Sequence, residues 1–133
     1  MLKVLPVESK DEQAEICKKC SVNYNPDALA YAATVDGRLA GISQFKVSAE
    51  GGLVYDLSPA DDFDNFEAMF VMGRGTLNFI DLCGVHKAYF VGEVKDAALL
   101  RAVGFKETED GRWFIDLEGF FTDHCHNHKE ESK

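Results

Sequence analysis

The sequence predicts a single α/β (α+β) domain in which one β-sheet is flanked by helices. Its 133 residues, 46% hydrophobic and 11% aromatic, suffice for one ordinary hydrophobic core, and no linker or Pro/Gly/Ser-rich tract divides them. Segments with strand periodicity alternate with segments of helical periodicity, and turn-forming residues separate them. We expect residues 1–121 to form the domain and residues 122–133 to form a polar tail that contains His and Cys.

The first half of the chain is predicted to contain strands and one helix. After a strand at Leu2–Val7, Ser9 and Glu12 have the spacing of a capping box, so a helix is expected to run from there to about Cys20. Two later turns, Asp36-Gly37 and Gly51-Gly52, indicate a meander of hairpin-connected strands. The strands of this meander are expected at Leu29–Val35, Leu39–Ala49 and Leu53–Leu57.

A long helix is predicted from about Pro59 to Cys83. Ser58 would cap it and Pro59 would occupy its first position. Its apolar residues recur at steps of three or four, a pattern typical of a helix packed against a sheet; they include Phe63, Phe66, Phe70, Leu77 and Ile80. Gly73 in its middle costs about 1 kcal/mol of helix propensity, which indicates close approach by another element, with strand backbone favoured. Cys83 is expected in the core.

The remaining elements are shorter. Gly84 ends the long helix, and a buried strand at Lys87–Val91 is expected next. A short helix at Asp96–Val103 and a hairpin at Phe105–Phe121, which turns at Asp110-Gly111, complete the domain.

Residues 84–105 have the order strand, acidic turn, short helix, glycine and aromatic residue. This stretch resembles the second half of a GCN5-related N-acetyltransferase domain, and the whole order of elements is similar to that fold. The resemblance implies a mixed, twisted sheet of about six or seven strands in which Leu53–Leu57 runs parallel to Lys87–Val91. In the family these strands splay apart, and the pantetheine arm of acetyl-CoA or another acyl-CoA binds there, here to backbone near Tyr55 and Leu57.

The family binds the CoA pyrophosphate with an Arg/Gln-x-x-Gly-x-Gly/Ala loop at a helix N-terminus. The corresponding segment here, residues 64–69, has no glycine and no cation, and it contains Asp64 and Glu67. A like-charge pair 4 Å apart costs about 4 kcal/mol at a dielectric constant of about 20, whereas the helix dipole offers about 0.3–1 kcal/mol. A shifted loop, Gly73-Arg74-Gly75, is the alternative cofactor-binding segment; it would shorten the helix that follows.

Other family positions also differ. The asparagine that usually follows the fifth strand aligns with Glu93, and the tyrosine that protonates the leaving thiolate aligns with Leu100, which has no proton to donate and is expected in the core. No catalytic residue is assigned. Glu50, Asp56 and His86 are the residues from which a base could be recruited, each at unexceptional spacing.

Cysteine and histidine residues form a second pattern. Cys17 and Cys20 lie one helical turn apart, and the tail supplies His124, Cys125, His126 and His128. Two thiolates with a Cys/His pair would make a tetrahedral zinc site. The alternative is that Cys17 and Cys20 are small core residues and that the tail binds no specific metal.

Charge and hydropathy restrict the partners. A net charge of −9 and a pI near 4.8 exclude nucleic acid and anionic membranes as expected partners. The apolar N-terminal run is too short for a signal peptide, so a cytoplasmic location is expected. The resemblance predicts a GNAT-type N-acetyltransferase, with activity reduced or lost, that transfers an acyl group to a small-molecule or cationic amine. A non-catalytic binding or metal-sensing module of the same fold is the alternative, and no oligomeric state is predicted.

Overall fold

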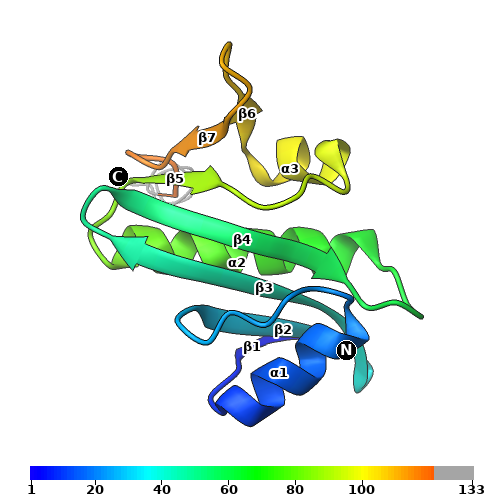
Figure 1. The fold of residues 1–133 in the computed structure, drawn as a ribbon. Helices are drawn as coiled ribbons and strands as arrows, with labels where there is room; N and C mark the ends of the chain where they lie inside the picture. The colour runs from blue at the N-terminus through cyan, green and yellow to red at the C-terminus, as the bar shows by residue number, and fades with distance from the viewer. Residues whose placement is uncertain (122–133) are drawn as a thin grey trace, which may run out of the picture.

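The computed structural model describes residues 1–121, in which one seven-stranded mixed sheet carries helices on both faces (Figure 1). The strands are β1 (Leu2–Pro6), β2 (Leu29–Val35), β3 (Arg38–Ser48), β4 (Gly51–Pro59), β5 (Lys87–Phe90), β6 (Lys106–Glu107) and β7 (Trp113–Asp116). The helices are α1 (Lys10–Lys19), α2 (Phe66–Leu82) and α3 (Ala97–Val103). The predicted α/β fold with a six- or seven-stranded sheet is therefore confirmed.

The sheet has the order β1-β2-β3-β4-β5-β7-β6. Neighbouring strands are antiparallel except β4 and β5, which are parallel as the sequence predicts. The hairpin of β6 and β7 is shorter than predicted, because the chain leaves the sheet after Asp116. No helix among residues 1–121 is long and apolar enough to cross a membrane.

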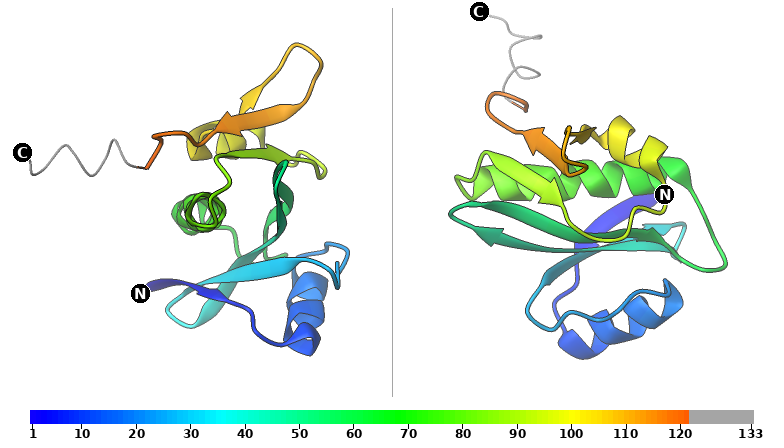
Figure 2. Two further views of the ribbon diagram at one scale, coloured as in Figure 1. Left: turned by 90° about the vertical axis from the view of Figure 1, so that its left-hand side faces the viewer. Right: turned by 45° about the horizontal axis from the view of Figure 1, so that its top comes forward.

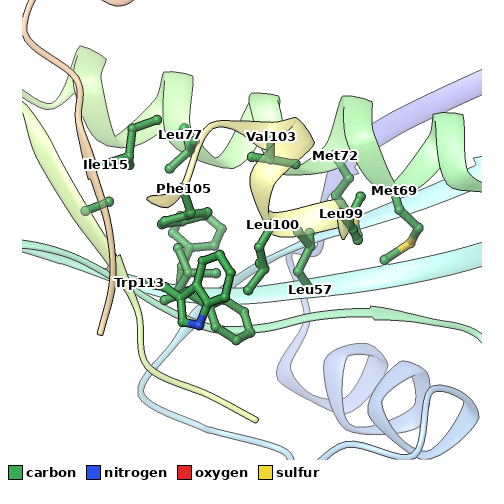
Figure 3. Close-up of a cluster of buried hydrophobic side chains, with 14 of the residues drawn as sticks. Leu57, Met69, Met72, Leu77, Leu99, Leu100, Val103, Phe105, Trp113 and Ile115 are labelled. Carbon is green, nitrogen blue, oxygen red and sulfur yellow. The ribbon is translucent and has the colours of Figure 1, made fainter. Parts of the chain in front are cut away.

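The helices cover the two faces of the sheet unequally. Helix α2 contacts β1 through β5 and also contacts α3, whereas α1 contacts β3 on the opposite face (Figure 2). The main core lies between the sheet, α2 and α3, and Figure 3 shows its side chains converging from these three layers. A smaller cluster lies under α1 and contains Cys17, Cys20 and Ile42.

The long helix starts later in the chain than the sequence predicts, at Phe66 and not at Pro59. Ser58 and Pro59 do not begin it, because they pair with Ile42 and Gly41 as the last residues of β4. The helix begins at Phe66, where the Asn65 side chain accepts a hydrogen bond from the amide of Ala68 at 3.0 Å. Both Ser58-Pro59 and Asn65 have residue types that can start a helix. Because Ser58 and Pro59 pair with β3, the helix starts after Asn65.

The far end of the helix also differs from the expectation. Cys83 is its C-cap residue and is exposed, so its prediction as a core residue is wrong. The helix ends at Leu82, one residue before its predicted end. At the other end of the chain, Ser9 caps α1 as predicted, since its hydroxyl accepts a hydrogen bond from the amide of Glu12.

Candidate functional site

The site lies where β4 and β5 part. Their parallel pairing joins residues 52–54 to residues 88–90, and one further bond runs from the Val91 amide to the Val54 carbonyl at 2.8 Å. The chain then turns away toward α3 while β4 continues to Pro59 (Figure 1). From Tyr55 onward, β4 has no strand partner on this edge within residues 1–121.

Gly92 holds the parting strands close together. A Cβ atom at this position would lie 1.8 Å from the Tyr55 carbonyl oxygen and 2.8 Å from its carbon. No side chain fits in that space, because the obstructing atoms belong to backbone. Glycine at position 92 therefore sets the point at which the two strands diverge.

A β-bulge in β4 arranges the side chains at this point. Gln44 pairs with Asp56 and Phe45 pairs with Val54, so Tyr55 is an extra residue in the ladder. The bulge shifts the alternation by one residue, and Val54 and Leu57 both face the main core although they are three residues apart. Tyr55 and Asp56 consequently lie next to each other on the α1 side, where both line one cavity.

We call this the α1-side cavity. Its walls come from the loop at residues 21–26, from Tyr55 and Asp56, and from Gly92, Glu93 and Lys95; its volume is about 470 Å³. A groove of about 690 Å³ adjoins it and shares Gly92 with it, and this groove is lined by Leu53, Tyr89 and Arg112 among others. Both lie along the β4–β5 junction, and Gly92 lines both of them.

Asp56 is a half-buried acid that lines this cavity. Desolvation raises the pKa of its carboxyl group above the ordinary value, and the hydrogen bond from Gln44 and the charge of Lys95 oppose that rise. The Gln44 side-chain nitrogen lies 2.6 Å from Asp56 Oδ2. A half-buried carboxylate with a raised pKa, open to a cavity, is suited to accept a proton.

On the other face of β4 lies a smaller hollow of about 200 Å³, which we call the α2-side cavity. It is lined by Leu57, Pro59, Asp64, Phe66, Met69, Lys95, Asp96 and Leu99. The first turn of α2 opens onto it, and residues 64–69 span that turn and its cap. Lys95 is the one cation among the described residues that line it, beside the carboxylates of Asp64 and Asp96. The Ala68 amide already donates a hydrogen bond to the Asn65 side chain.

The shifted-loop expectation is wrong, because Gly73, Arg74 and Gly75 lie in the middle of α2. The Arg74 guanidinium donates a hydrogen bond to the Val103 carbonyl at 2.7 Å and stacks on the rings of Phe70 and Phe120. It thereby ties α2 to the end of α3 rather than facing a ligand.

Gly73 confirms the predicted close approach, with a different neighbour. A Cβ atom there would lie 2.7 Å from a Val103 methyl group and 3.2 Å from Leu57, so side chains and not strand backbone approach it. The glycine lets α3 pack directly against α2.

The other sequence candidates are dispersed. Glu50 lines the adjoining groove, and Glu93 lines the α1-side cavity. His86 is exposed and bound to Asp81 through Nδ1 at 2.6 Å, a contact that raises the pKa of the imidazole. Leu100 is 3% exposed and packs among the side chains in Figure 3, so its prediction as a core residue is confirmed. Of the three candidate bases, only Asp56 lies where β4 and β5 diverge.

Cys17 and Cys20 are core residues, with 1% and 2% of their surfaces exposed. Desolvation raises the pKa of Cys17 to about 11 and that of Cys20 to about 12, so both are protonated thiols at neutral pH. The other predicted zinc ligands, His124, Cys125, His126 and His128, lie outside the described residues. Within residues 1–121 no cluster of three or more His, Cys, Asp or Glu side chains could hold a metal.

Sequence reasoning missed Gln44 and Lys95. Gln44 lies in the buried middle of β3 and is 0% exposed, which is an uncommon location for glutamine. The polar pair Ser43-Gln44 between Ile42 and Phe45 was the available signal. Lys95 is exposed in a loop, and nothing in its spacing indicates that it borders both cavities.

Comparisons with known proteins address the fold. No protein-family model matches the sequence, and no curated protein matches it. Solved structures do match. The ribosomal-protein-S18-alanine N-acetyltransferase of Escherichia coli aligns with a TM-score of 0.65 and 16% identity over 88% of this chain and 94% of its own. A Bacillus subtilis acetyltransferase in complex with CoA aligns with a TM-score of 0.64 and 13% identity over 88% of this chain and 99% of its own.

The PaiA N-acetyltransferase of Thermoplasma acidophilum, in complex with coenzyme A, gives a TM-score of 0.66 and 11% identity over 87% of this chain and 99% of its own. The likeness extends over nearly all of each domain while the identities are low. The chain has the GCN5-related N-acetyltransferase fold, as its order of elements predicts.

Proposed function

We propose that this protein transfers an acyl group from an acyl thioester to an amine, with Asp56 as the general base. The observation that carries the proposal is the position of Asp56, a half-buried carboxylate at the point where β4 and β5 diverge. Two of the structural neighbours are complexes with CoA, which supports an acyl-CoA as donor.

The donor would lie along the free edge of β4. Backbone groups near Tyr55 and Leu57 have no strand partner on that edge in the described chain, so they are available to an extended pantetheine arm. The amine would enter through the α1-side cavity. Net charge and the carboxylates of Asp56 and Glu93 favour a small cationic amine.

The chemistry is direct attack. Asp56 takes a proton from the ammonium group, the free amine nitrogen forms a bond to the thioester carbonyl carbon, and the carbon–sulfur bond breaks. The leaving thiolate then needs a proton. Leu100 cannot supply it and is enclosed in the core, so in this proposal water relays to the sulfur the second proton, which the nitrogen loses as the amide forms. Without a side-chain proton donor for the thiolate, we expect a low rate of acyl transfer.

The 3′-phospho-ADP part of CoA fits poorly. Asp64 and Glu67 stand at the start of α2, where their charges complement the helix dipole and take the place that an anion would need. Lys95 offsets this only in part, since Asp96 lies in the same cavity. We therefore propose weak binding of acetyl-CoA, carried mainly by the acyl-pantetheine portion.

A second candidate function is a non-catalytic binding module. Leu100 at the place of the family's proton donor and carboxylates at the place of its phosphate loop favour it. Metal sensing gains no support, because Cys17 and Cys20 are buried protonated thiols. The proposal keeps the cytoplasmic location, where such free thiols persist.

The test is thiol release from acetyl-CoA in the presence of a panel of amines. We expect slow, amine-dependent release that falls by about 10²–10⁴-fold in Asp56→Asn. The matched control is Asp116→Asn, an exposed carboxylate of β7 outside both cavities, which should leave the rate unchanged. Binding of the donor without any turnover would favour the non-catalytic module, and equal rates for wild type and Asp56→Asn would exclude Asp56 as the base.

A further inference from the structure

The Asp56 carboxylate is held by one side chain, that of Gln44. Gln44 is fully buried on β3, where a neutral amide is stable only if its donors and acceptor are satisfied. It makes four hydrogen bonds: to the Asn23 carbonyl at 2.8 Å, to Asp56 at 2.6 Å, from the Asn25 amide at 3.0 Å and from Gln13 at 2.8 Å. Every donor and acceptor site of the amide is therefore used.

Two of these partners fix the orientation of the amide. The Asn25 backbone N–H can only donate, so the Gln44 atom that faces it must be the oxygen. The Asn23 carbonyl can only accept, so the atom that faces it must be the nitrogen. The same nitrogen then points its second proton at Asp56 Oδ2. Gln44 is thus a dedicated donor to the carboxylate and cannot flip without losing bonds to backbone.

The amide is anchored further from α1. Gln13, which is 1% exposed, donates to the Gln44 oxygen and to the Asn25 carbonyl at 3.2 Å. The Lys10 ammonium donates in turn to the Gln13 oxygen at 3.2 Å and to the Ala28 carbonyl at 2.6 Å. Helix α1, the loop at residues 23–25 and β4 are therefore joined through a single buried amide.

The loop and Asp56 are also two walls of the α1-side cavity. A change at Gln44 would consequently reach the cavity wall and the carboxylate together. We infer that Gln44 is a positioning residue that orients the Asp56 carboxylate and couples it to the loop against which the amine binds. The catalytic consequence rests on the proposed function, whereas the effect on Asp56 itself does not.

The electrostatic part follows from the direction of the bond. A hydrogen bond donated to a carboxylate favours its charged form, so removing the donor raises the pKa of Asp56 further. Other titratable groups also face Asp56 from the surrounding elements; they are Cys17, Cys20, Tyr24, Tyr55, Glu93 and Lys95. Lys95 acts in the same direction as Gln44, but it is exposed and its charge is screened by solvent.

The test variant is Gln44→Met, which keeps the length of the side chain and removes its donors. The pKa of Asp56 is read from the pH dependence of its carboxyl ¹³C chemical shift, assigned with Asp56→Asn. We expect that pKa to rise, the acid limb of kcat/KM to move to higher pH, and kcat to fall by about tenfold with the KM for acetyl-CoA unchanged. Amide exchange at Asn25 should become faster.

The matched control is Thr76→Val. The Thr76 and Ser43 hydroxyl groups share a hydrogen bond of 2.9 Å, so this change also removes a buried hydrogen bond to β3, but next to Gln44 and away from Asp56. It should lower stability and leave both the pKa of Asp56 and the pH profile in place. Gln13→Met provides a milder second variant if Gln44→Met does not fold, because Gln44 keeps its two backbone partners; it should raise the pKa of Asp56 by less.

The outcomes of these experiments distinguish the positioning role of Gln44 from the proposed acyl-transfer function. An unchanged pKa of Asp56 in Gln44→Met, or in Gln13→Met if the first does not fold, overturns the positioning role whatever the activity. A raised pKa in a protein that shows no acyl transfer supports the contact but removes the proposed function. An altered pKa together with an unmoved kcat/KM profile overturns the coupling to catalysis.

Discussion

The two sides of β4 at its divergence from β5 differ in how they are built. On the α1 side, a fully buried amide network holds Asp56 against a defined cavity. On the α2 side, the hollow is smaller, and the first turn of α2 presents carboxylates where a phosphate-binding helix would present bare amides. Under the proposed function, this difference means that the α1 side handles the proton and the amine and that the α2 side contributes little to binding of the CoA nucleotide.

The largest expected effect comes from Gly92→Ala, which adds a side chain where β4 and β5 diverge. Because the added Cβ would overlap the Tyr55 carbonyl, the β5–α3 loop must move, and both cavities share that loop. We expect a loss of at least about 2 kcal/mol in the free energy of unfolding, measured by urea denaturation.

Gly84→Ala is the control for this change. Gly84 has a φ of 85° with open space around it, so alanine there costs only the left-handed backbone penalty of about 1 kcal/mol. Equal effects of the two substitutions would show that Gly92 does not set the divergence of β4 and β5.

A smaller effect is expected from building a phosphate site on the α2 side. Asp64→Arg with Glu67→Gly removes two carboxylates and adds one cation at the start of α2. We expect acetyl-CoA to bind about tenfold more tightly, with a gain that fades as salt is raised. Calorimetric titration at two ionic strengths measures it.

Glu107→Arg with Glu109→Gly makes the same charge change on the exposed β6 turn and is its control. An equal gain in that variant would attribute the effect to net charge and remove the local explanation.

The smallest effect concerns the stability cost of Asp56. Desolvation raises the pKa of its carboxyl group above 3.8, so ionising that group costs the folded state more than the unfolded state. This penalty is present above the folded pKa and vanishes as the pH falls below 3.8. Asp56→Asn, which can still accept the Gln44 bond, should therefore raise Tm by about 2–4 °C at pH 7 and have no such effect at pH 3. A Tm lowered at pH 7 would mean that the charge stabilises the fold.

The order of elements was predictable from the sequence, because turn dipeptides such as Asp36-Gly37 and the apolar stripe of the long helix are local signals. The site was predictable only in part. Tyr55 and Leu57 were placed on the correct strand, but nothing local shows that a bulge turns Tyr55 and Asp56 to the same side. The bulge depends on pairing with β3.

Two expectations failed because tertiary contacts outweighed local pattern. Ser58-Pro59 has good helix-start chemistry, yet pairing with β3 keeps it in β4. Gly73-Arg74-Gly75 has the composition of a phosphate loop, yet its glycine gives space to Val103 and its arginine binds the end of α3. Gln44 shows the converse, since its role depends on residues 12 to 31 positions away in the chain.

The central claim is that the free edge of β4 binds the acyl-pantetheine arm of CoA and that the protein does not recognise the nucleotide. The most direct measurement compares the dissociation constants of acetyl-CoA and S-acetylpantetheine by calorimetry at low and high salt. The account predicts constants within about tenfold of each other and little dependence on salt, because the start of α2 presents the carboxylates of Asp64 and Glu67 and no cation. Binding of acetyl-CoA more than about 100-fold tighter and strongly weakened by salt would contradict it, and so would the absence of binding by either compound.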